Sequence, residues 1–171
     1  MRTGAVVRPA RPRIDRMLAA MTSTLILLRH GQSTWNAENL FTGWWDADLS
    51  DQGRSEASAA GALMAEAGLA PDVVHTSLQT RAIRTANLAL DAMGLLWLPV
   101  KRHWRLNERH YGDLTGQNKA EATAKFGADQ VKVWRRSYDT PPPAIGADNA
   151  HNPNTDPRYA HLPVDVLRTS E

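Results

Sequence analysis

An arginine, a histidine and a glycine directly follow a short apolar stretch of the chain. Residues 25–28 are Leu, Ile, Leu and Leu, a run that predicts a strand buried on both faces of a parallel sheet. Ligands of open α/β sheets bind at the carboxyl ends of the strands, where the guanidinium of Arg29 would attract an anion. The imidazole of His30 can attack a phosphoryl group and become an N-phosphohistidine. These residue types suit phosphoryl chemistry, but for an isolated Arg–His pair a core strand followed by a solvated polar turn is the commoner meaning.

A second junction of the same kind lies further along the chain. Residues 72–76 predict another strand, and Ser77 is expected to cap the helix that follows it. Arg81 falls in the first turn of that helix. If the connections between strands are right-handed crossovers, Arg81 reaches the same sheet edge as Arg29 and His30. A solvated helical arginine is the alternative.

Charged residues cluster in two later segments. Glu108 lies between Arg105 and Arg109, whose positive charges would hold its carboxylate ionised. A surface ion pair is the usual meaning of such a pattern. Arg135 and Arg136 are adjacent, so on a helix they reach one anion only at a bend or a helix end, which the prolines that follow provide. The alternative for these two arginines is a solvated basic face.

Capping residues and prolines predict the remaining elements. Ser33 and Ser50 are expected to cap helices, the second of which continues to about Ala67 and ends at Gly68. The prolines from Pro141 to Pro163 predict an irregular loop rather than a packed element. The other predicted elements are a strand at 98–101 and helices at 119–127 and 129–137.

Composition predicts one globular domain behind a basic extension. The chain of 171 residues is 42% apolar and 22% charged, contains no cysteine, and has no apolar run near the ~20 residues that cross a bilayer. Its net charge is +2, but residues 1–21 alone carry +4, which leaves about −2 for the remainder and no general nucleic-acid footprint. We expect residues 1–21 to be a disordered extension or a mis-assigned start ahead of Met21, and 22–171 to be the domain.

Seven segments carry a resemblance to a known family. They are RHGQSTWN at 29–36, NLFTGW at 39–44, TSLQTRAIRT at 76–85, LNERHYG at 106–112, NKAEA at 118–122, VWRRS at 133–137 and PRYAHLP at 157–163. In this order they resemble the histidine phosphatase superfamily and, more narrowly, its cofactor-dependent phosphoglycerate mutases. The resemblance implies an α/β fold, with a three-layer, open and mostly parallel sheet, helices on both faces, and an incomplete C-terminal part.

The resemblance also assigns roles to residues. It implies that His30 is the nucleophile, that Arg29 and Arg81 surround the phosphoryl group, and that Glu108 is the general acid/base toward the substrate hydroxyl. Lys119, Arg135 and Arg136 would close over the substrate as a lid. The residues implied to bind substrate are Arg29, Ser33, Asn36, Thr42, Gly43, Arg81, Glu108, Arg109, Tyr111, Lys119, Arg135 and Arg136.

The implied reaction interconverts 2-phosphoglycerate and 3-phosphoglycerate through a phosphohistidine, as part of glycolysis and gluconeogenesis. It is primed by 2,3-bisphosphoglycerate and uses no metal. The implied partners are small phosphorylated three-carbon acids, together with association into a homo-oligomer, and neither nucleic acid nor a membrane. The implied location is the cytoplasm.

One feature departs from the family pattern. Members carry a second histidine in an HGNS-like motif at the end of a later strand, and no such motif occurs in this sequence. We therefore expect a truncated mutase-like domain that lacks its C-terminal part. Three hypotheses follow: a phosphoglycerate mutase impaired by truncation, a phosphatase of the same superfamily, and a non-catalytic remnant that binds anions at most.

Overall fold

A short parallel sheet and a pair of long helices form one end of the molecule. The computed structural model describes residues 23–163, so the predicted basic extension at residues 1–21 and the last eight residues lie outside the described part. The elements, in chain order, are α2 (Thr34–Ala37), α3 (Asp51–Glu66), β1 (Val74–Thr76), α4 (Thr80–Ala92), β2 (Val100–Arg102), α5 (Lys119–Phe126) and α6 (Ala128–Arg136).

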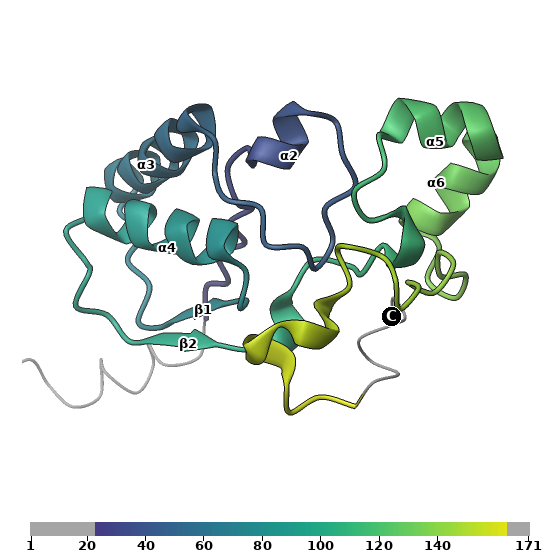
Figure 1. The fold of residues 1–171 in the computed structure, drawn as a ribbon. Helices are drawn as coiled ribbons and strands as arrows, with labels where there is room; N and C mark the ends of the chain where they lie inside the picture. The colour runs from purple at the N-terminus through teal and green to yellow at the C-terminus, as the bar shows by residue number, and fades with distance from the viewer. Residues whose placement is uncertain (1–22, 164–171) are drawn as a thin grey trace, which may run out of the picture.

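Strands β1 and β2 are parallel, with Val74 opposite Val100 and Thr76 opposite Arg102. Helix α4 packs on β1, and α3 packs along α4 (Figure 1). Helices α5 and α6 pack on each other at the opposite end of the molecule from α3 (Figure 1). The predicted α/β class with a parallel sheet is confirmed, and within residues 23–163 that sheet has two strands.

The strand predicted at residues 25–28 is wrong for the described structure. The segment has no regular secondary structure, and the side chains of Leu25, Leu27 and Leu28 are 80%, 85% and 41% exposed. A parallel strand obtains its hydrogen bonds and its cover from neighbouring strands. Within residues 23–163 no strand pairs with this segment, so its apolar character alone does not make it a buried strand.

Local capping was predicted correctly for two helices and incorrectly for a third. Ser33 caps α2, and its hydroxyl accepts the N–H of Asn36 while the Asn36 side chain accepts the N–H of Ser33. Ser50 caps α3. Ser77 does not cap α4, because the helix begins only at Thr80. There the carboxylate of a distant residue, Asp46, accepts the N–H of Thr80 at 2.7 Å and takes the place of a local cap.

The proline-rich segment 141–163 is irregular, as predicted, but it is packed. It contains 3₁₀ turns at Pro153–Thr155 and Pro157–Tyr159. Ile145 and Tyr159 are 1% and 0% exposed, and the ring of Tyr159 lies against Trp44 with centroids 4.7 Å apart. The few apolar residues of the segment therefore suffice to anchor it on the rest of the chain.

Helix α3 crosses α4 at very short range. A Cβ atom at Gly61 would lie 2.3 Å from the carbonyl oxygen of Ala89, so only glycine allows this approach of the two backbones. A similar approach occurs between Gly31 and Gly53 at the start of α3, where a Cβ at Gly31 would lie 2.1 Å from the Gly53 carbonyl oxygen. Among the described residues, no helix has the length and apolarity needed to span a membrane.

The Gly61–Ala89 crossing generates a stability prediction. We expect Gly61→Ala to lower the free energy of unfolding by about 1–3 kcal/mol, because the added methyl group must push the two helices apart. At an open helix position the same change would stabilise by about 1 kcal/mol. Urea denaturation followed by circular dichroism measures the difference, with Ala62→Ser on the exposed side of α3 as control. A Gly61→Ala protein more stable than the unaltered chain would contradict the close crossing.

Candidate active site

The imidazole of His30 contacts the backbone of Gly31, which is hydrogen-bonded to helix α4. Its Nδ1 lies 2.7 Å from the carbonyl oxygen of Gly31, a contact that suits an Nδ1–H donor and leaves Nε2 with its lone pair. The N–H of Gly31 donates to the hydroxyl of Thr85 at 3.2 Å, and that hydroxyl donates to the carbonyl of Arg81 at 2.8 Å. The nucleophile predicted from the sequence is therefore fixed to α4 through one backbone unit.

A pocket of about 290 Å³ opens beside His30. Four of the residues predicted to bind or react with substrate line it: Arg29, His30, Asn36 and Lys119. They come from the segment before α2, from α2 itself and from the start of α5. Gly31, Gln32 and Glu56 complete the lining. The structure thus brings together residues that lie almost ninety positions apart in the sequence.

Arg81 lies fully buried next to the loop 42–48. Its side chain is 0% exposed, and it donates to the carbonyl of Gly43 at 2.8 Å and to that of Trp45 at 3.1 Å. It also pairs with the carboxylate of Glu108 at 2.8 Å, and the Glu108 side chain is partly open to solvent. The buried arginine therefore joins the loop 42–48 to the segment that carries the predicted acid/base.

Two residues that support this arrangement were missed by sequence reasoning. Gln79 is buried, its Nε2 donates to the Gly43 carbonyl at 2.7 Å, and its Oε1 accepts the N–H of Glu108 at 3.1 Å. Thr85, described above, holds Gly31. Thr85 lies four residues after Arg81, which is one helical turn, so its position on the Arg81 face of α4 is a signal that the sequence contained. No sequence signal marked Gln79, because its partners are distant in the chain.

The electrostatic environment favours a neutral His30. Burial is the largest cause that lowers its pKa below the ordinary value, and the positive charges of Arg81 and Arg29 act in the same direction. The hydrogen bond to Gly31 and the negative charge of Glu108 oppose them with smaller total effect. Burial also lowers the pKa of Lys119, and the positive charges of Arg135 and Arg29 lower it further. Cations of this kind favour an anion as a ligand.

A second group of predicted residues gathers around Phe41. Lys119 and Arg135 each lie over its ring, with their charged groups 5.9 Å from the centroid, and Tyr111 packs against it at 5.1 Å. The Nε of Arg135 is buried and has no hydrogen-bond partner within the described residues. Arg136, its neighbour, is exposed. Burial is the largest cause that raises the pKa of Tyr111, followed by the charge of Glu108.

Four predicted substrate-binding residues are engaged elsewhere or covered. Arg109 donates to the carbonyl of Trp134 at 2.9 Å and to that of Ser137, so its guanidinium caps the C-terminal end of α6. Ser33 is 0% exposed and caps α2, Thr42 is buried, and the carbonyl of Gly43 accepts from Arg81 and Gln79. Substrate binding by these residues stays a prediction. Within residues 23–163, no group of three His, Asp or Glu side chains is placed to hold a metal ion.

The chain is similar to known proteins in sequence and in structure. The sequence pattern of the Histidine phosphatase superfamily (branch 1) matches residues 25–151. The chain is 62% identical over 149 residues to a 2,3-bisphosphoglycerate-dependent phosphoglycerate mutase of Thermobifida fusca, a match that covers 87% of this chain and 60% of that protein. It is 61% identical over 140 residues to the enzyme of the same name from Sphingopyxis alaskensis, with 82% and 61% covered. The chain thus spans about 60% of the length of these curated relatives.

A solved structure of a mycobacterial glucosyl-3-phosphoglycerate phosphatase complexed with VO3 is also similar. The two chains are 32% identical and superpose with a TM-score of 0.57 over 66% of this chain and 51% of that one.

The surroundings of His30 predict its titration. We expect an NMR titration of its ring, assigned with His30→Gln, to give a midpoint below 6.5, because burial and two arginines disfavour the imidazolium. The folded state therefore favours the neutral ring, so the associated stability is present above pH 6.5 and is lost as the pH falls below it.

A matched pair of variants separates the contribution of Arg29. Arg29→Gln should raise the midpoint of His30, whereas Arg102→Gln, on β2, should leave it in place, because Arg102 is not among the charges that act on this ring. A midpoint of 6.5 or above in the unaltered chain would contradict the assigned environment.

Proposed function

This chain belongs to the histidine phosphatase superfamily, branch 1, and on that premise we propose that His30 accepts a phosphoryl group as a covalent intermediate. The observation that carries the proposal is the pocket that His30, whose Nδ1 is engaged by the Gly31 carbonyl, lines together with Arg29 and Lys119. In the transfer, the bond from Nε2 to phosphorus forms while the bond from phosphorus to the donor oxygen breaks. The cations would neutralise charge on the phosphoryl oxygens.

We propose further that the activity is that of a 2,3-bisphosphoglycerate-dependent phosphoglycerate mutase, which interconverts 2- and 3-phosphoglycerate. Two relatives about 60% identical bear this name, which supports the proposal. The pocket suits a small phosphorylated acid, because Arg29 and Lys119 offer positive charge and the Asn36 amide offers hydrogen bonds. Here 2,3-bisphosphoglycerate supplies the phosphoryl group that primes His30. A cytoplasmic location belongs to the same proposal.

Glu108 is the residue proposed to move the substrate proton. When a phosphoryl group leaves a substrate oxygen, that oxygen must gain a proton, and the reverse transfer must remove one. The carboxylate of Glu108 is partly exposed and pairs with Arg81. The backbone N–H of Glu108 donates to the side-chain amide oxygen of Gln79. It is therefore fixed in position but reachable from solvent, as an acid/base group must be.

Only one histidine serves the pocket. All six histidines of the sequence lie within residues 23–163, and of these only His30 lines the pocket. Arg29 and Lys119 would then stabilise the negative charge that develops on the phosphoryl oxygens, without a second imidazole in the pocket. We therefore expect transfer of a phosphoryl group to His30.

Intact-mass measurement tests the proposed function. After incubation with 2,3-bisphosphoglycerate, we expect the unaltered chain to gain the mass of one phosphoryl group, and we expect acid to remove it, as for a phosphohistidine. His30→Ala should gain nothing. His75→Ala, which removes an exposed histidine at β1, should label like the unaltered chain.

The other hypotheses give different results in the same experiment. Labelling at His30 with phosphate release and no isomerisation of 3-phosphoglycerate would replace the mutase by a phosphatase. A folded chain that gains no phosphoryl group would contradict the proposal and favour the anion-binding remnant.

A further inference from the structure

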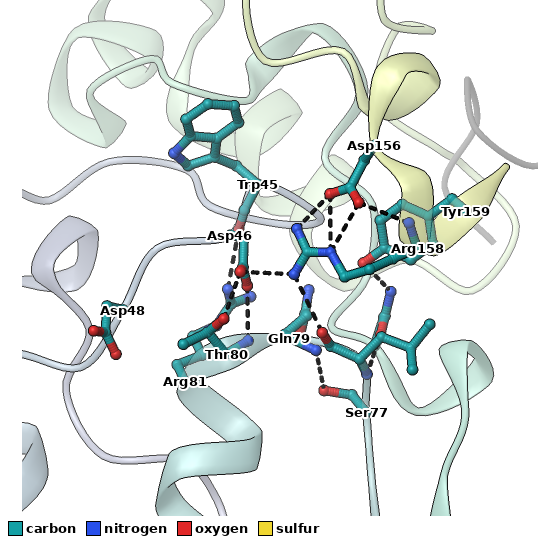
Figure 2. A network of polar contacts seen from close by, with 12 residues as sticks. Trp45, Asp46, Asp48, Ser77, Gln79, Thr80, Arg81, Asp156, Arg158 and Tyr159 are labelled. Atoms are coloured by element: carbon teal, nitrogen blue, oxygen red, sulfur yellow. Dashed lines mark hydrogen bonds and ion pairs between the residues drawn. The ribbon is translucent and has the colours of Figure 1, made fainter.

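A polar network joins the turn at Pro157–Tyr159 to the beginning of α4, close to Arg81 (Figure 2). Asp46 is at its centre. One carboxylate oxygen of Asp46 accepts the N–H of Thr80 at 2.7 Å, and the other accepts the Thr80 hydroxyl at 2.5 Å. Because Gln79, which precedes the helix, makes no capping hydrogen bond with its side chain, Asp46 supplies the cap of α4.

Arg158 holds Asp46 in this place. Its Nη1 lies 2.6 Å from Asp46 Oδ2, and its Nε donates to the two oxygens of Asp156 at 2.9 and 3.0 Å. Figure 2 shows the guanidinium between the two carboxylates. Nη1 also donates to the carbonyl of Leu78 at 3.3 Å. One arginine thus bridges two chain segments in a fork geometry that lysine cannot reproduce in full.

The network continues to both members of the Arg81–Glu108 pair. Asp46 directly follows Trp45, whose carbonyl accepts from Arg81. On the other side, the hydroxyl of Tyr159 accepts from the Asn107 amide at 2.9 Å, and Asn107 directly precedes Glu108. The turn that carries Arg158 and Tyr159 therefore supports the backbone next to each partner of the ion pair.

We propose that Arg158 is a positioning residue that acts through Asp46. By fixing Asp46 on the N-terminus of α4, it fixes the adjacent Trp45 carbonyl and so the orientation of the Arg81 guanidinium beside Glu108. Arg158 is not among the residues that line the His30 pocket. The inference rests on the proposed function, since the oriented pair serves phosphoryl transfer at that pocket.

A double-mutant cycle on the full chain tests the route of the effect. The measured quantity is the rate of His30 labelling by 2,3-bisphosphoglycerate at saturating and at limiting concentrations. We expect Arg158→Ala and Asp46→Ala each to lower the saturated rate by about 10- to 100-fold, because a small misplacement of a reacting group has effects of that size. The double variant should be no slower than Asp46→Ala alone, since Arg158 acts through that residue.

Two further variants control for general loss of structure. Arg54→Ala removes the 3.1 Å ion pair between Arg54 and Asp48, a residue of the same loop 42–48 as Asp46. The side chains of Arg54 and Arg158 are similarly exposed, at 39% and 30%. We expect Arg54→Ala to label like the unaltered chain. Arg158→Lys keeps the charge and should be slowed less than Arg158→Ala. Effects of Arg158→Ala and Asp46→Ala that multiply in the double variant would overturn the proposal.

A second readout does not depend on activity. The Nε–H resonance of Arg81 in the ligand-free chain reports the surroundings of its guanidinium. We expect this resonance to shift or broaden in Arg158→Ala and Arg158→Lys and to stay in place in Arg54→Ala. An unchanged resonance in the Arg158 variants would overturn the positioning role. Absence of labelling in the unaltered chain would overturn the proposed function instead, and the resonance would still decide on Arg158.

Discussion

The buried guanidinium of Arg81 is the interaction on which the candidate site depends. It is removed from water completely, and the carbonyls of Gly43 and Trp45 and the carboxylate of Glu108 are its partners. A buried charge without partners costs several kcal/mol, so the loop 42–48 and the Glu108 segment must both meet α4 when this part of the chain folds. Folding of this part of the chain therefore also positions Glu108, the proposed acid/base group.

Helix α4 also carries the contact that holds the backbone next to His30, the proposed nucleophile. Thr85, one turn after Arg81, accepts the N–H of Gly31, and the Gly31 carbonyl contacts the ring of His30. His30 and the Arg81–Glu108 pair are thus both positioned from α4, while Lys119 and Arg135 come from α5 and α6 at the other end of the molecule (Figure 1). The cations of α5 and α6 can therefore contact a phosphorylated ligand while His30 contacts it from the α4 side.

Sequence reasoning succeeded where the cause of a feature is local. Ser33 and Ser50 cap helices because their hydroxyls accept from N–H groups three residues further along the chain. The strands predicted at 72–76 and 98–101 correspond to the parallel pair β1 and β2. It failed where the partner is distant. Residues 25–28 are apolar but have no pairing strand in the described part, and Ser77 lost its capping role to Asp46, about thirty residues earlier. Long-range partners of the same kind explain why Gln79 and the packing of Tyr159 were missed.

A crystal structure of the full chain with orthovanadate would test whether His30 is the phosphoryl acceptor. We expect vanadium within bonding reach of His30 Nε2, in the pocket with Arg29 and Lys119, and we expect Arg81 still to donate to Gly43, Trp45 and Glu108. Vanadate bound away from His30, or an Arg81 guanidinium turned out of its carbonyl partners, would contradict it.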